Sequence, residues 1–307
     1  MQSPTELLQQ ATAATRRGDF AAGGAGASGA LELFRARGDA DGRARSVNLL
    51  GAIAFERGDL AAAERHFGEA LALAVRTGEA TLAARASNNL ASVRHLHGDL
   101  ESALSTYRTA LLSYQRLGDR RGMAETWHNV TLTFRDLGRA GEADAASSEA
   151  LRHAELIGDA GLVALVMTGR AEAALLRADY DLAGRAIGRA RELAAEAEDA
   201  LTAAEADHLL ARLLLRLGRL DEARTTSLAA AGAARAHGSA LLAAEATGIA
   251  AVAARRLGHA GEAEGLYAEA RAALDRLDAR NFLSRLDAAW DVRPLPPTPH
   301  SPPPPSP

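Results

Sequence analysis

The stretch that decides the fold runs from Arg57 to Leu100 and reads RGDLAAAERHFGEALALAVRTGEATLAARASNNLASVRHLHGDL. It carries one signal three times, a glycine followed by an acid: Gly58-Asp59, Gly78-Glu79 and Gly98-Asp99. Glycine adopts the left-handed conformation that ends a helix, and the acid can accept hydrogen bonds from the free N–H groups that begin the next. The stretch therefore predicts helices of about 16–17 residues, each roughly 25 Å long, separated by tight turns.

The same glycine signal recurs through most of the 307 residues, in two alternating series with a spacing of forty. One series is Gly18, Gly58, Gly98, Gly138, Gly218 and Gly258, with Ala178 as its exception. The other is Gly38, Gly78, Gly118, Gly158 and Gly238, with Glu198 and Asp278 as exceptions. The acids that follow are Asp19, Asp39, Asp59, Glu79, Asp99, Asp119 and Asp159. Two helices in every forty residues predict about seven antiparallel helix pairs. The first helix opens on a capping box, Ser3-Pro4-Thr5-Glu6.

Small residues occupy fixed positions in the second helix of each predicted pair. One column is Ala30, Ala70, Ala110, Ala150, Ala190, Ala230 and Ala270. Another, seven residues earlier, is Gly23, Ala63, Ala103, Ala143, Ala183, Ala223 and Ala263. This spacing places both columns on one helix face, and a position that is always small lets a neighbouring helix approach closely. Each pair then buries its apolar face only against its neighbours, which is the principle of a solenoid.

These residues resemble the tetratricopeptide repeat family over about residues 3–278. The resemblance rests on Leu50-Gly51, Gly58-Asp59-Leu60, Ala63, Phe67 and Ala70, with Trp127 and Phe134 at the aromatic positions of a first helix. The period of forty exceeds the family's usual 34, and the motif's final proline is missing. Such longer repeats are similar to those of bacterial regulators of the maltose-activator type, peptide-sensing regulators of Gram-positive bacteria and kinesin light chains. The resemblance implies an all-α, right-handed superhelical solenoid that binds proteins.

The expected organisation is one repeat domain, 1–291, followed by a proline-rich tail. Its repeats lie near 1–38, 39–78, 79–118, 119–158, 159–198, 199–238 and 239–278, and a capping helix covers 280–291. Residues 292–307 cannot be helical, because proline lacks the N–H group that a helix needs, and we expect them to be disordered. The tail also matches a ligand of SH3 domains, although a solvated tail is the favoured interpretation.

Composition excludes several classes of function. A net charge of −4 and a pI of about 6.2 argue against direct nucleic-acid binding. The chain has no cysteine, which removes thiolate chemistry. No apolar run reaches the length of a membrane span and no secretory signal begins the chain, so we expect a cytoplasmic protein. We also expect no catalytic site, metal or cofactor.

Three short motifs are better explained by structure than by chemistry. Gly24 to Gly29 match a phosphate-binding glycine pattern, but no strand precedes them. His95 and His97 do not share a helix face, so surface or groove histidines are favoured over metal ligands. Asp221-Glu222 fits the first turn of a helix, where acids offset the helix dipole.

The candidate binding residues come from the first helix of each pair, which lines the concave side in the resembled fold. One column reads Asn48, Asn88, His128, Thr168, His208 and Gly248. The predicted ligand-binding residues are Asn48, Arg85, Asn88, Asn89, Glu125, His128, Asn129, Arg135, His208 and Arg212. Asparagine is a poor helix former, and its amide matches the hydrogen-bonding groups of a peptide. The segment from Ser87 to Ala91 looks like the groove signature of peptide-binding repeats.

Two interpretations of these asparagines stay open. In one they bind a peptide or protein segment in the groove. In the other they hydrogen-bond between adjacent helices and only hold the stack together, because buried polar groups need partners in either case. The function predicted first is a protein- or peptide-binding scaffold. The alternative is a regulatory sensor module that acts in trans on a bacterial transcriptional regulator.

Overall fold

The computed structural model describes residues 2–16 and 19–291, and within them every regular element is an α-helix. The helices are α1 (Pro4–Arg16), α2 (Phe20–Ala36), α3 (Ala40–Glu56), α4 (Leu60–Thr77), α5 (Ala80–His97), α6 (Leu100–Leu117), α7 (Arg120–Asp136), α8 (Ala140–Glu155), α9 (Ala160–Leu176), α10 (Tyr180–Glu196), α11 (Ala200–Arg216), α12 (Leu220–Ala236), α13 (Ala240–Leu257), α14 (Ala260–Arg276) and α15 (Arg280–Asp291). The predictions for Met1, Gly18 and the tail, 292–307, lie outside the described residues.

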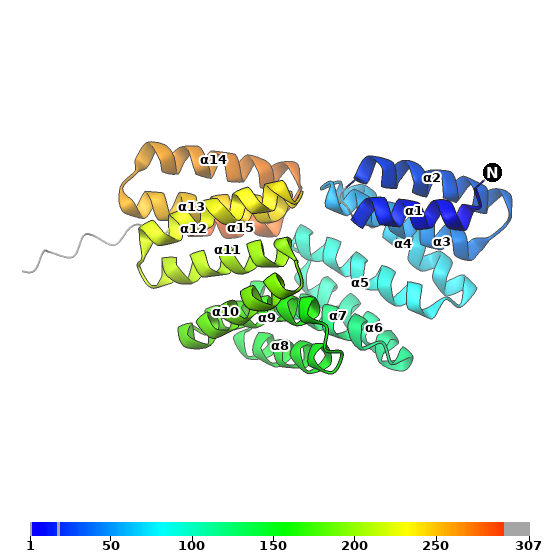
Figure 1. Ribbon diagram of the computed structural model, residues 1–307, viewed down its shortest axis with the longest axis horizontal. Helices are drawn as coiled ribbons and strands as arrows, with labels where there is room; N and C mark the ends of the chain where they lie inside the picture. Colours follow the sequence, from blue (N-terminus) through cyan, green and yellow to red (C-terminus); the bar gives the residue numbers. More distant parts are fainter. Residues whose placement is uncertain (1, 17–18, 292–307) are drawn as a thin grey trace, which may run out of the picture.

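The described helices form seven antiparallel pairs that stack in chain order, followed by the single helix α15 (Figure 1). The odd-numbered helices contact one another from pair to pair and make an inner layer. The even-numbered helices cover the outside. This arrangement confirms the predicted all-α solenoid.

Left-handed residues end the helices at the predicted period of twenty. Every described glycine of the two series has a positive φ, as at Gly58 with 76°. The three exceptions keep the same conformation: Ala178 (57°), Glu198 (53°) and Asp278 (48°). A Cβ atom makes this conformation costly, so the packing of the flanking helices, and not glycine alone, imposes the turn.

Side-chain caps begin most of the helices. The carboxylates of Asp19, Asp39, Asp59, Asp119, Asp159, Asp179 and Asp199 each accept a hydrogen bond from a backbone N–H three residues later. Glu79 and Asp99 were expected to do the same, but neither side chain makes a cap hydrogen bond. The longer side chain of Glu79 is a poor fit to the cap position. The Ser3–Glu6 capping box is confirmed, because each backbone N–H donates to the other's side chain.

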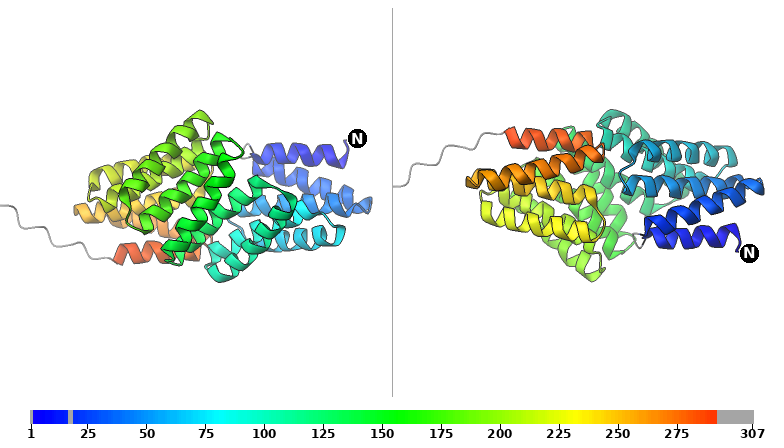
Figure 2. Two further views of the ribbon diagram at one scale, coloured as in Figure 1. Left: turned by 90° about the horizontal axis from the view of Figure 1, so that it is seen from below. Right: turned by 90° about the horizontal axis from the view of Figure 1, so that it is seen from above.

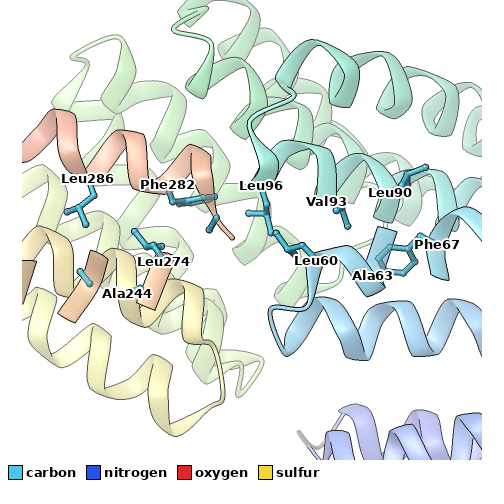
Figure 3. Close-up of a cluster of buried hydrophobic side chains, with 12 residues drawn as sticks. Leu60, Ala63, Phe67, Leu90, Val93, Leu96, Ala244, Leu274, Phe282 and Leu286 are labelled. Carbon is cyan, nitrogen blue, oxygen red and sulfur yellow. The ribbon is translucent and has the colours of Figure 1, made fainter. Parts of the chain in front are cut away.

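The solenoid turns far enough for its C-terminal end to meet its third helix pair. Helix α15 contacts α5 as well as α13 and α14, and Figure 2 shows α15 reaching the helices of the N-terminal half. One apolar cluster spans the junction (Figure 3): Leu60, Phe67, Leu90, Val93 and Leu96 on one side and Ala244, Leu274, Phe282 and Leu286 on the other. Leu277 packs on the turn at Gly58, where a Cβ atom would lie 2.2 Å from its Cδ2. The C-terminal end of the superhelix therefore packs against its second and third helix pairs.

Candidate functional site

All ten predicted binding residues lie on the inner helical layer, on α3, α5, α7 and α11. The structure divides them into two groups by exposure. Partly or fully exposed are Asn48, Arg85, Asn88, Asn89, Glu125 and Asn129. Buried, or nearly so, are His128, Arg135, His208 and Arg212. Only the first group offers side chains to a partner on the inner surface.

The asparagines of the first group form an amide patch, which we define as Asn48, Asn88, Asn89 and Asn129. The side-chain Nδ2 of Asn129 donates to Oδ1 of Asn88 across the α5–α7 boundary, at 3.4 Å. This distance is long for a hydrogen bond, and both side chains are only half-buried. Oδ1 of Asn48 is buried without a partner among the described residues. This hydrogen bond between adjacent helices is the kind of contact that the stacking interpretation expects. It uses one donor of Asn129 and one acceptor of Asn88, and the other amide groups of these two side chains can still bind a ligand.

Charged groups flank the amide patch on its exposed side. Arg85 is exposed one helical turn before Asn88 and Asn89. Glu125 lies 3.6 Å from Arg121 on the same helix, and Arg121 also pairs with Asp159. An arginine beside free amides can hold a carboxylate of a bound segment through charge-assisted hydrogen bonds.

The two histidines are buried and uncharged. Burial lowers the pKa of His128 to about 4 and that of His208 to about 3. Nδ1 of each ring is buried with no hydrogen-bond partner in the described chain. His128 packs against Gly169, where a Cβ atom would lie 2.7 Å from Nδ1. At neutral pH neither ring contributes charge to the inner surface.

Arg135 and Arg212 both donate to one buried carboxylate, that of Glu172. Nη1 of Arg135 lies 2.6 Å from Oε1 of Glu172, and Arg212 reaches the same oxygen from α11. Glu172 is 4% exposed. Burial alone would raise the pKa of Glu172, but the two arginines outweigh this effect and lower it to about 2. These three residues are one half of an ion-pair network.

Asp136 is the centre of the other half, where α5, α7 and α15 meet. Its carboxylate, with a side chain 1% exposed, lies 2.6 Å from Nε of Arg135 and 3.2 Å from Nε2 of His95. From α15, Asn281 donates to it and Arg285 approaches within 3.4 Å. Burial opposes its ionisation, but Arg135 and His95 outweigh burial and hold the pKa of Asp136 well below its usual range. The ion-pair network (Arg135, Asp136, Glu172, Arg212 and Arg285) therefore fastens α15 to the inner layer.

Four residues of this region were not predicted from the sequence: Asp136, Glu172, Asn281 and Arg285. One signal was available for Glu172, which interrupts an apolar helix exactly forty residues before Arg212. Opposite charges at the same position of adjacent repeats face each other across the helix boundary. No comparable signal existed for Asn281, because its partner Asp136 is close only through the closure of the superhelix.

A third acid on the inner layer, the partly buried Glu205, gives the protein a predicted pH dependence. Burial, opposed by a 2.9 Å hydrogen bond from Thr168, raises the pKa of Glu205 from 4.5 to about 7. The folded state thus holds this proton more tightly than the unfolded state, so stability falls as pH rises from about 4.5 to 7. We expect Glu205→Gln to be more stable than the wild type by about 1–3 kcal/mol at pH 8 and equal to it at pH 4.5. Urea denaturation at both pH values measures this difference.

The control is Glu64→Gln, an exposed position on α4. It should follow the wild type at both pH values. Equal stabilities of Glu205→Gln and the wild type at pH 8 would show that Glu205 ionises normally in the folded chain.

Within residues 2–16 and 19–291, no group of three or more histidine or acidic side chains is arranged to hold a metal ion. None of the described helices combines the length and apolar character needed to cross a membrane.

The family comparison agrees with the repeat architecture. A family model described as tetratricopeptide repeat matches residues 82–156, which lie in α5 to α8 and the turn that follows. A search of curated proteins gave no match. The chain is therefore an all-α helical-repeat protein in which one segment, residues 82–156, is similar to the tetratricopeptide repeat.

Solved structures extend the likeness to nearly the whole chain. A Rap protein complexed with Competence and Sporulation Factor is 16% identical, with a TM-score of 0.74, and the match covers 92% of this chain and 75% of that one. The quorum sensor NprR from B. thuringiensis is 15% identical (TM-score 0.57; 94% and 87% covered). Aspartyl phosphate phosphatase F from Bacillus subtilis is 13% identical (TM-score 0.65; 75% and 59% covered). At these identities the likeness shows the fold alone.

Proposed function

We propose that this chain is a non-catalytic binding protein that holds a protein or peptide segment on the amide patch of its inner layer. The observation that carries the proposal is the row of half-exposed amides on neighbouring helices, with exposed Arg85 beside it. Side-chain amides at helical spacing offer donors and acceptors to an extended backbone. The arginine adds a preference for an acidic side chain or a C-terminal carboxylate.

The comparisons support this proposal through architecture. One neighbour of the same fold is complexed with Competence and Sporulation Factor, and another is a quorum sensor. We further propose that the protein is cytoplasmic. We also propose that its forty-residue repeats are of the variant found in bacterial regulators and kinesin light chains. A phosphatase is also among the neighbours. Against catalysis here, the buried carboxylates Asp136 and Glu172 are held by arginines and are not free to act on a substrate.

The alternative proposal is a regulatory sensor that acts in trans on another protein, such as a bacterial transcriptional regulator. The junction between α15 and α5 favours it, because it joins helices that are far apart in the sequence. A segment bound on the inner layer would act on the same helices that hold this junction. Binding would then change the shape that a second protein meets.

The double variant Asn88→Ala/Asn129→Ala tests the amide patch. We expect its affinity for acidic peptides to fall by about 1–3 kcal/mol, because peptide groups would lose their partners. The melting temperature should stay level or rise, since alanine is the better helix former. Fluorescence anisotropy with a labelled library of acidic peptides measures affinity, and circular dichroism measures melting.

The matched control is Ser105→Ala/Thr109→Ala, which removes two exposed polar groups from the outer helix α6. It should leave peptide affinity unchanged. A loss of several degrees in Asn88→Ala/Asn129→Ala with affinity preserved would support the stacking interpretation and contradict the proposal. Failure of the wild type to bind any library peptide would also contradict it.

A further inference from the structure

A cavity of about 600 Å³ lies between α11, α13, α14 and α15, at the C-terminal end of the inner layer. Its size is within the range of sites that hold small molecules. Residues of the amide patch do not line it. Figure 3 shows four of its lining residues, Ala244, Leu274, Phe282 and Leu286, on the C-terminal side of the apolar junction. We call this space the C-terminal cavity.

One part of the wall of the C-terminal cavity is apolar. It is formed by Leu215, Ile249, Val252, Leu274, Phe282 and Leu286. These side chains come from four helices and surround the space from several sides. Such a surface favours an apolar ligand body, since each buried methylene group contributes about 0.8 kcal/mol.

The mouth of the cavity is positively charged. Arg216 and Arg256 line it near the C-terminal ends of α11 and α13, and both are exposed. Nη1 of Arg256 donates to the carbonyl oxygen of Leu215 at 2.9 Å, which holds its guanidinium at the rim. Within the described residues, neither arginine forms an ion pair with a carboxylate, although many other exposed arginines do. The mouth therefore offers two cationic groups to an anion.

The inner end of the cavity is polar, and its arginines lie beside carboxylates. His208 lines it and is 4% exposed, and its Nδ1 makes no hydrogen bond to the described residues. Arg212 pairs with Glu172, and Arg285 lies 3.4 Å from Asp136 and 3.6 Å from Glu245. His208 and Arg216 are eight residues apart on α11, which separates the two ends by about 12 Å. This length suits an extended chain of about ten carbon atoms.

We propose that the C-terminal cavity binds a small amphipathic carboxylate. Its carboxylate meets Arg216 and Arg256 at the mouth, and its apolar body lies against Leu215, Ile249 and Val252. A polar group at the far end of the ligand hydrogen-bonds with His208. Charge decides the class of ligand, because an ammonium group would be repelled at this mouth and an alcohol would gain nothing from it. The site is independent of the amide patch.

The test is titration calorimetry of the full chain with decanoate, 10-hydroxydecanoate, decanol and decylamine. Decanoate should bind at least tenfold more tightly than decanol, and decylamine should not bind measurably. The variant Arg216→Gln/Arg256→Gln should reduce decanoate affinity to that of decanol without lowering the melting temperature. Equal affinities of the wild type for decanoate and decanol, or no binding of either, would overturn the proposal.

Two further variants locate the ligand inside the cavity. Ala289→Trp fills the cavity from α15 and should abolish decanoate binding, whereas Ala268→Trp on the exposed face of α14 should preserve it. 10-Hydroxydecanoate should bind the wild type more tightly than decanoate, because its terminal hydroxyl can hydrogen-bond with His208. His208→Phe should remove this preference. Unchanged decanoate binding by Ala289→Trp, with the fold intact by circular dichroism, would place the ligand elsewhere and contradict the assignment.

Discussion

Replacing Glu172 by alanine is expected to lower the free energy of unfolding by about 3–5 kcal/mol. The side chain is 4% exposed, and its Oε1 accepts hydrogen bonds from both Arg135 and Arg212. The substitution leaves two guanidinium groups facing each other in the interior without their shared anion. Urea denaturation of the wild type and the variant at pH 7, followed by circular dichroism, measures the loss.

The matched control is Glu101→Ala, which also breaks an ion pair between neighbouring repeats. The pair of Glu101 with Arg139 is exposed, at 64% and 40% of the side chains. Exposed pairs contribute about 0–1 kcal/mol, so this variant should remain close to the wild type. A loss in Glu172→Ala no larger than that in Glu101→Ala would show that the network does not stabilise the inner layer.

The stabilisation by Glu172 should also depend on pH. Its folded pKa of about 2 lies below the value of 4.5 for a free side chain. The contribution is therefore present above pH 4.5 and is lost as pH falls through about 2. The difference between wild type and Glu172→Ala should shrink over this range, which separates an ionic origin from a loss of packing.

The local features of the fold were predictable because short stretches of sequence encode them. A glycine at about every twentieth position ends a helix. The small residues that recur in the second helix of each pair let neighbouring helices pack closely, and Ala70 and Ala110 are both 0% exposed. The exceptions are instructive. Ala178 adopts the same left-handed conformation although it is not glycine. The regular spacing of the helices therefore predicts the position of a turn better than the residue type at the turn does.

The junction between α15 and α5 was not predictable. The curvature of a solenoid is the sum of small rotations between successive repeats. A short stretch of sequence does not predict this total rotation. Asp136 and Asn281 are hydrogen-bonded although 145 positions separate them. Arg135 is held at this junction by Asp136, whereas Arg212 is held by Glu172 of the adjacent repeat. The sequence had assigned both arginines to an open groove. The asparagines of the amide patch are half-buried, and their role in binding stays a prediction.

Replacing Phe282 by alanine should open this junction. Phe282 is 7% exposed, lies in the apolar cluster with Leu60 and Leu96 (Figure 3), and its ring centroid is 6.2 Å from that of His95. Truncation of a buried phenylalanine costs about 3–5 kcal/mol. In a solenoid, each repeat is stabilised mainly by its neighbours, so the cost should fall on α15 and its contact with α5. We expect a larger radius of gyration by small-angle X-ray scattering and faster amide exchange at the end of α5.

Phe34→Ala separates loss of closure from loss of stability. Phe34 is 4% exposed on α2, where its ring fills the space beside Gly42, and it lies in the first helix pair, far along the chain from α15. The same truncation there should cost a similar amount, but exchange should rise in α2 and α3 while the scattering profile stays that of the wild type. Equal expansion in both variants would mean that general destabilisation, and not the junction, sets the size. An unchanged radius in Phe282→Ala would show that the ion pairs of Asp136 with α15 hold the junction together without the apolar cluster.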